Sequence, residues 1–74
     1  MAIFGKTLAV HVRYAGKSYD LPFEELDLRN GASDDDVREA LARHFDVSPA
    51  TFRAFVVERH RTGNLTVRPE AVFG

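Results

Sequence analysis

Cysteine is absent from this chain of 74 residues, and so are long hydrophobic runs. Without cysteine there is no disulfide framework and no thiolate metal site. The longest apolar runs hold only a few residues, far fewer than the roughly 20 that a membrane-spanning helix needs. No charged segment followed by an apolar stretch opens the chain. We therefore expect a cytoplasmic protein that does not bind membranes.

Sequence signatures of catalysis and of cofactor binding are also missing. The three histidines are His11, His44 and His60. No short metal-ligand spacing relates them. The five glycines are isolated from one another, so no phosphate-cradling loop is present. The serines fall at predicted turns or helix caps, and none lies in a Gly-x-Ser-x-Gly elbow. We expect no metal, no cofactor and no enzymatic activity.

The composition is that of an ordinary folded domain. Hydrophobic residues make up 45% of the chain and charged residues 28%, with a formal net charge of -1. A chain of this length forms one domain, here residues 1–74, and buries only about 60% of the surface that it exposes when unfolded. The charge is divided unevenly, because residues 1–46 carry a net charge of -3 and residues 47–74 a net charge of +2.

The first part of the chain predicts a β-hairpin. Residues 7–14 alternate between apolar and polar side chains, which is the two-residue period of a half-buried strand. A tight turn centred on Gly16 and Lys17 leads into a second alternating run over residues 18–24. Pro22 cannot donate a ladder hydrogen bond, so we expect this second strand at a sheet edge.

A helix follows a segment, residues 25–32, that we expect to be mostly loop. Ser33 can cap the first N–H groups of the helix, and the acidic run 34–36 complements its positive end. The helix is predicted to extend to about Asp46. Its apolar stripe consists of Val37, Ala40, Leu41, His44 and Phe45. This stripe must be covered by the sheet, with Leu41 packed against the first strand, whereas Arg38 should face outward.

The remaining chain predicts one short helical turn and a second hairpin. Ser48 and Pro49 favour a turn that ends near Phe52. Residues 54–60 and 65–68 then have the composition of strands.

The register of this second hairpin is left open by the sequence. A two-residue turn at Gly63 and Asn64 puts Ala54, Val56, Glu58 and His60 on the face of Leu65 and Val67. A three-residue loop instead puts Phe55, Val57 and Arg59 on that face.

The order of elements is strand, strand, helix, strand, strand. It predicts an α+β, two-layer ββαββ domain, with one helix packed on a mixed four-stranded sheet. This arrangement resembles the ubiquitin-like β-grasp fold over most of the chain. The opening also resembles that of ubiquitin, with identical residues at Met1, Ile3, Phe4, Lys6, Thr7 and Leu8.

The absence of catalytic signatures and the compact fold favour a non-enzymatic module that binds a protein partner. We expect the basic second hairpin and the C-terminal tail to make the contact. The predicted partner-binding residues are Arg59, Arg61, Arg68 and Phe73. An unpaired strand edge also allows the chain to form a homodimer.

Two alternative functions stay open at this point. Ubiquitin-like modifiers and sulfur carriers act through an exposed Gly-Gly terminus, so the resemblance implies possible activation at Gly74, although Phe73 precedes it here. The second alternative is a small nucleic-acid-binding module, because arginines interleave with Phe55 and Val57 as in a sheet that stacks bases. A pI of about 6.3 argues against general nucleic-acid binding.

Overall fold

The structure is a computed structural model that describes residues 8–70. The elements are β1 (Ala9–Tyr14), β2 (Lys17–Pro22), η1 (Phe23–Leu26), α1 (Asp34–Phe45), η2 (Pro49–Phe52), β3 (Phe55–Arg59) and β4 (Leu65–Pro69), of which η1 and η2 are short 3₁₀ helices. Within the described range, no helix combines the length and the hydrophobicity needed to span a membrane.

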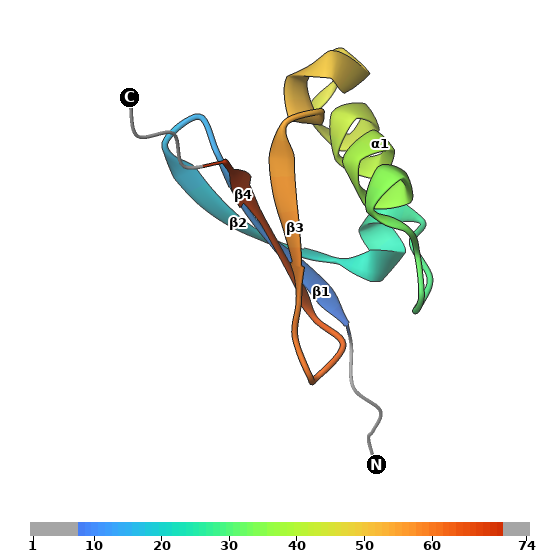
Figure 1. Cartoon of the computed structure of the whole chain (residues 1–74). Coiled ribbons are helices and arrows are strands. Elements are labelled where there is room, and N and C mark those ends of the chain that lie inside the picture. The colour runs from blue at the N-terminus through green and yellow to red at the C-terminus, as the bar shows by residue number, and fades with distance from the viewer. Residues whose placement is uncertain (1–7, 71–74) are drawn as a thin grey trace.

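The four strands form one mixed sheet in the order β2-β1-β4-β3. The neighbours β1 and β2 are antiparallel, as are β3 and β4, whereas β1 and β4 in the centre are parallel. Figure 1 shows α1 on one side of this sheet. The arrangement is the ubiquitin-like β-grasp topology, and it confirms the predicted α+β fold with one helix on a four-stranded sheet.

The turn between β1 and β2 is centred on Ala15 and Gly16, so the prediction of Gly16 and Lys17 was one residue too late. Tyr14 pairs with Lys17 across the hairpin. The φ angles of Ala15 and Gly16 are 54° and 79°. Positive φ at both central residues is what a type I′ turn requires, and the twist of that turn matches the twist of the flanking strands. As predicted from Pro22, β2 is an outer strand of the sheet.

The start of α1 is the predicted cap. Ser33 Oγ accepts a hydrogen bond from Asp36 N at 3.1 Å, and the Asp36 side chain accepts one from Ser33 N at 3.2 Å. This capping box satisfies two main-chain N–H groups that the helix itself leaves unpaired. The helix ends at Phe45, and Asp46 then adopts a left-handed conformation with φ 56°. The observed range agrees with the predicted one.

The buried face of α1 differs from the predicted stripe at its margins. Its buried residues are Val37, Ala40, Leu41 and Ala42. Ala42 was not part of the stripe, and η2 packs against α1 as a second contact surface besides the sheet. His44 was part of the stripe but is exposed, with its ring edge-on to Phe45 at a centroid distance of 5.0 Å.

An aromatic cluster fills the space between η2, α1 and one end of the sheet. Its central ring, Phe52, is fully buried. The Phe52 centroid lies 4.8 Å from that of Phe55 and 5.1 Å from that of Tyr14. The Phe45 centroid in turn lies 5.0 Å from Tyr14 and 5.0 Å from Tyr19. The short turn η2 therefore supplies the centre of this part of the core.

The β3–β4 hairpin has the register of the three-residue loop. Across the hairpin, Phe55 lies opposite Pro69, Val57 opposite Val67, and Arg59 opposite Leu65. His60 N donates to Asn64 O at 3.0 Å, which leaves residues 61–63 as the loop. Gly63 has φ 97°, and a Cβ added there would lie 2.9 Å from Leu8 Cδ2, so the loop is held close against Leu8.

This register decides which side chains of β3 face α1. Leu65 and Val67 are buried. Side chains of directly opposite residues lie on the same face of a sheet. Phe55, Val57 and Arg59 therefore lie on the face that α1 covers, and Glu58 lies on the other face, which we call the outer face.

Candidate functional site

The outer edge of β3 offers unused main-chain groups. β3 ends the sheet, with β4 on one side only. Hydrogen-bonded pairs alternate along an antiparallel ladder, and His60 and Asn64 form one such pair. The N–H and C=O groups of Phe55, Val57 and Arg59 therefore point away from β4. Among these groups, only Phe55 O has a hydrogen-bond partner within residues 8–70, and that partner is the Arg38 side chain. We call the free groups of Val57 and Arg59 the β3 edge.

Arg38 connects α1 with the start of β3, and the prediction that it faces solvent was wrong. Its Nε and Nη2 each donate to Phe55 O at 3.1 Å, and its Nη1 pairs with Asp35 Oδ1 at 3.2 Å. The side chain is only 24% exposed. The sequence did contain a signal for this half-buried position, because Arg38 is next to Val37 of the apolar stripe. Long side chains at the margin of a buried face can lie along that face.

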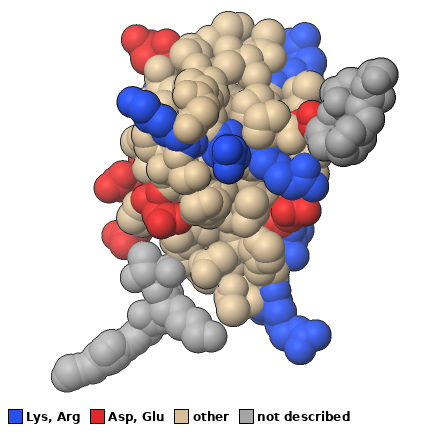
Figure 2. Space-filling view, turned by 90° about the vertical axis from the view of Figure 1, so that its left-hand side faces the viewer, with Lys and Arg blue, Asp and Glu red and all other residues tan. Residues whose placement is uncertain are grey.

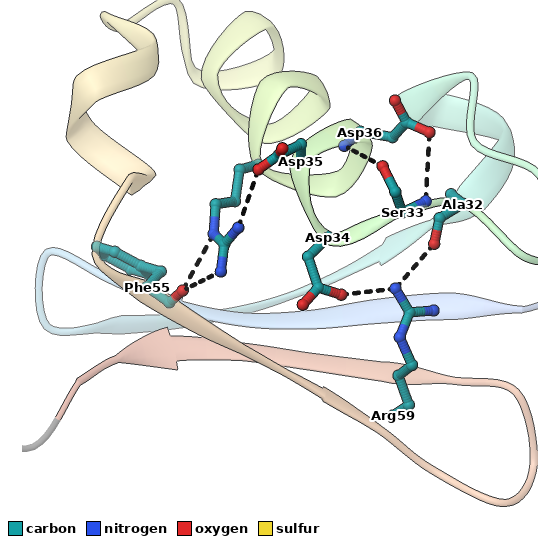
Figure 3. Close-up of polar contacts among 8 residues, drawn as sticks. Ala32, Ser33, Asp34, Asp35, Asp36, Phe55 and Arg59 are labelled. Atoms are coloured by element: carbon teal, nitrogen blue, oxygen red, sulfur yellow. Dashed lines mark hydrogen bonds and ion pairs between the residues drawn. The ribbon is translucent and has the colours of Figure 1, made fainter.

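Arg59 makes the reverse connection, from the end of β3 to the start of α1. Its Nη2 donates to Ala32 O at 2.8 Å and pairs with Asp34 Oδ1 at 2.6 Å. Figure 3 shows Arg59 reaching from its strand toward Ala32 and Asp34 beside the capping box. Arg38 and Arg59 thus join the two ends of β3 to the first half of α1. Both guanidinium groups are thereby fixed beside the β3 edge.

The outer face of the hairpin carries a second set of paired side chains. Arg68 Nη2 lies 3.1 Å from Glu58 Oε2, and His60 Nε2 lies 2.6 Å from Thr66 Oγ1. The first contact joins β4 to β3, and the second joins β4 to the residue that follows β3. Figure 2 views the side of the molecule away from α1 and shows Lys and Arg side chains in a band across it, with Asp and Glu side chains nearby.

Two further arginines stand at the ends of β3. Arg53 follows η2 and Arg61 begins the β3–β4 loop, and both are exposed. Within the described part of the chain neither forms an ion pair. Arg53 lines a hollow of 210 Å³ whose other charged residues are Arg38, Asp35 and Glu39. Among the described residues, the arginines beside β3 that lack an ion-pair partner are therefore Arg53 and Arg61, one at each end of the strand.

The predicted partner-binding residues border one strand but do not share one face. Arg59 lies on the side of α1, Arg68 lies on the outer face, and Arg61 lies in the loop. Only the hairpin register, which the sequence left open, separates Arg59 from Arg68 in this way. Phe73 and Gly74 lie outside the described residues.

The observed register also places the apolar residues of β3. Phe55 and Val57 pack against the hydrophobic core on the side of α1. Base stacking on a sheet requires such side chains on an open face, beside arginines. Phe55 and Val57 do not lie on the outer face.

The Arg68–Glu58 pair gives a prediction about pH. The hydrogen bond that Arg68 donates, together with its positive charge, lowers the pKa of the Glu58 carboxyl. A carboxyl whose pKa is lower in the folded state stabilises the fold above its unfolded pKa, which is about 4.3 for glutamate. This contribution is lost as the pH falls through the folded pKa. In an NMR titration, we expect Glu58 to titrate below its usual range in the wild type and closer to that range in Arg68→Gln.

The control for this titration is Arg29→Gln, which removes an exposed arginine in the loop before α1. It should leave the Glu58 midpoint unchanged. A Glu58 midpoint that is the same in Arg68→Gln and in the wild type would contradict the ion pair.

Other surface features offer less chemistry. The hollow beside the loop that precedes α1 has a volume of 350 Å³, and most of its lining residues are charged or polar. Among residues 8–70 there is no buried polar or charged side chain. The same residues contain no group of three or more histidine, aspartate or glutamate side chains that could hold a metal ion.

Comparison with known proteins finds no matching family model, no matching curated protein and no matching solved structure. The class of the protein is therefore defined by its topology and its surface. It is a small α+β domain of ubiquitin-like β-grasp topology, with arginines on both sides of an open outer strand.

Proposed function

We propose that this domain is a non-enzymatic protein-interaction module that presents its β3–β4 hairpin to a protein partner. One observation carries the proposal: β3 ends the sheet, the outward main-chain groups of Val57 and Arg59 have no hydrogen-bond partner among residues 8–70, and ordered arginines lie on both faces of the hairpin. Unpaired strand edges are common binding elements in small β-rich domains. Arginine is also enriched at the energetic centres of protein interfaces.

The electrostatics of the hairpin support binding rather than catalysis. Acid–base catalysis depends on groups whose burial and neighbours shift their pKa toward neutrality. Here Glu58 is half-exposed and its pKa is shifted downward, away from neutrality, by Arg68. The paired charges instead form a fixed surface pattern, which is what specificity for a protein partner needs.

The proposal is tested by affinity capture from a lysate of the source cells with the full chain as bait. Replacing an interface arginine by alanine should weaken capture of the bound protein about fivefold or more, since such residues contribute about 1 kcal/mol or more. We expect this result for Arg61→Ala, Arg68→Ala and Phe73→Ala. Circular dichroism should show that each variant remains folded.

The matched control is Arg43→Ala, which removes an exposed arginine from the last turn of α1. Capture should be unchanged in this variant. If Arg61→Ala and Arg68→Ala retain the partner as well as Arg43→Ala does, the hairpin is not the interaction surface.

The β-grasp topology also supports a second candidate function, in which the chain is a modifier or sulfur carrier activated at Gly74. The same capture experiment discriminates between the two when the intact mass of the bait is measured. A covalent adduct or thiocarboxylate at Gly74 would favour this candidate. An unmodified bait with a bound partner would favour the interaction module.

A further inference from the structure

We propose that the β3 edge binds an extended, acidic segment of a partner protein, which adds to the sheet as a fifth strand beside β3. This inference rests on the proposed function and names the chemistry of the partner. It follows from three features: the free main-chain groups, the position of the arginines, and the different character of the other sheet edge.

The main-chain groups set the length of the segment. Phe55 O is occupied by the two hydrogen bonds from Arg38, so the open part of the edge consists of the groups of Val57 and Arg59. An added strand pairs through every second residue. A segment of about five residues, an ordinary strand length, is therefore enough to use this edge.

The arginines set the charge of the segment. Successive side chains of an added strand alternate between the two faces of the sheet. On the α1 side they would lie beside Arg59, which is held by Asp34. On the outer face they would lie beside Val56 and Glu58 of β3, because Arg68 belongs to β4, one strand further from the edge. The carboxylates of the segment therefore belong on the α1 side and at its two ends, and its apolar side chains on the outer face. Arg53 and Arg61, at the ends of β3, have no ion-pair partner among residues 8–70. Carboxylates at the two ends of the segment would supply those partners.

β2, the other outer strand, has a different chemistry. Phe23 N donates to Leu8 O at 2.9 Å, and by alternation the main-chain groups of the even-numbered residues of β2 point outward. These residues are Ser18, Asp20 and Pro22. Pro22 has no N–H to donate. Asp20 places a carboxylate beside this edge, 2.7 Å from His11 Nδ1, and β2 has no arginine at either end. The acidic segment therefore fits β3 and not β2.

A second copy of this chain fits the β3 edge less well. Antiparallel pairing of two β3 strands about Val57 would place Arg59 of each copy opposite Phe55 of the other. Because Arg38 is bonded to Phe55 O, arginines of the two copies would meet at both ends of the pairing. Like charges placed opposite one another destabilise a strand pair. A partner with carboxylates avoids this repulsion.

The test uses the full chain labelled with ¹⁵N and three short, capped peptides as probes. In the first peptide glutamate alternates with valine. In the second, lysine replaces glutamate. The third has the sequence of the first but is methylated at every backbone nitrogen, so it keeps the charge and cannot donate a main-chain hydrogen bond. Binding is followed by the shifts of the amide resonances and by amide hydrogen exchange.

We expect the acidic peptide to shift the amides of Val57 and Arg59 and to slow their hydrogen exchange. The methylated peptide should bind about tenfold more weakly or worse, since two main-chain hydrogen bonds of ordinary strength account for such a factor. The lysine peptide should not bind. The charge reversal Arg61→Glu should weaken binding of the acidic peptide, whereas Arg43→Glu on α1 should not.

Three results would overturn the inference. These are equal binding of the methylated and unmethylated peptides, perturbations confined to Ser18 and Asp20 of β2, and no binding of the acidic peptide. Each leaves the proposed function standing if capture of a protein partner still depends on Arg61 and Arg68. Loss of that dependence would instead remove the proposed function itself, whatever the peptides do.

Discussion

Replacing Phe52 by alanine will lower the free energy of unfolding by about 3 to 5 kcal/mol, as measured by urea denaturation followed by circular dichroism. Phe52 is fully buried, and its ring centroid lies within 5.1 Å of those of Phe55 and Tyr14. Removal of the ring leaves a cavity between η2, α1 and the sheet that the surrounding rings can close only in part. A domain of this size has a total stability of roughly 4 to 11 kcal/mol, so the substitution removes a large fraction of that stability.

The control for Phe52→Ala is Phe52→Leu, which keeps an apolar side chain of intermediate size at the same site. Its loss should be clearly smaller, because less contact surface and less volume are removed. If both variants lose the same free energy, the cavity is not the cause. If neither loses more than about half a kcal/mol, Phe52 is not at the centre of the core.

Leu41→Ala will have the second large effect, a loss of about 2 to 5 kcal/mol in the same assay. Leu41 is fully buried on the face of α1 that lies against the sheet, and Val10 and Val12 of β1 are fully buried as well. Deleting the isobutyl group removes contacts from the layer between helix and sheet, where packing holds α1 in place.

The matched control is Leu28→Ala, the same substitution at a leucine that is only partly buried against the core. The loss there should be smaller, because less apolar surface leaves water on folding. Equal losses at Leu28 and Leu41, or a loss at Leu41 below about half a kcal/mol, would show that the buried face of α1 is assigned wrongly.

Polar contacts add to this packing beside the proposed binding surface. Arg38 reaches from α1 to Phe55 O, and Arg59 reaches from β3 to Ala32 O and Asp34. The first contact occupies Phe55 O and so limits the length of the open edge. Both contacts fix the positions of the two guanidinium groups beside it. The helix therefore contributes to the proposed binding surface although none of its main-chain groups belongs to the edge.

Sequence patterns predicted the elements of the fold because their causes are local. The capping box needs only Ser33 and Asp36 three residues apart. The strands of the first hairpin follow from the two-residue alternation of apolar side chains, and those of the second from their strand-forming composition. The β-grasp topology followed from the order of these elements, since one amphipathic helix and two hairpins of this length have few ways to bury their apolar faces together. The turn at Ala15 was misplaced because alanine rarely adopts positive φ.

The sequence by itself thus determined the four strands, the capped helix and the fold class. It did not predict η1, because its pattern placed Phe23 and Glu24 in the second strand and the residues after them in a loop. Tertiary structure alone decided the register of the β3–β4 hairpin, and with it the separation of Arg59 from Arg68 onto opposite faces. It also turned Arg38 inward and placed Phe52 at the centre of the aromatic cluster. The physical reason is that propensity, capping and periodicity act over a few neighbouring residues. Strand register and side-chain partners depend on contacts between segments far apart in the chain, here the burial of Leu65 and Val67 beside β1 under α1.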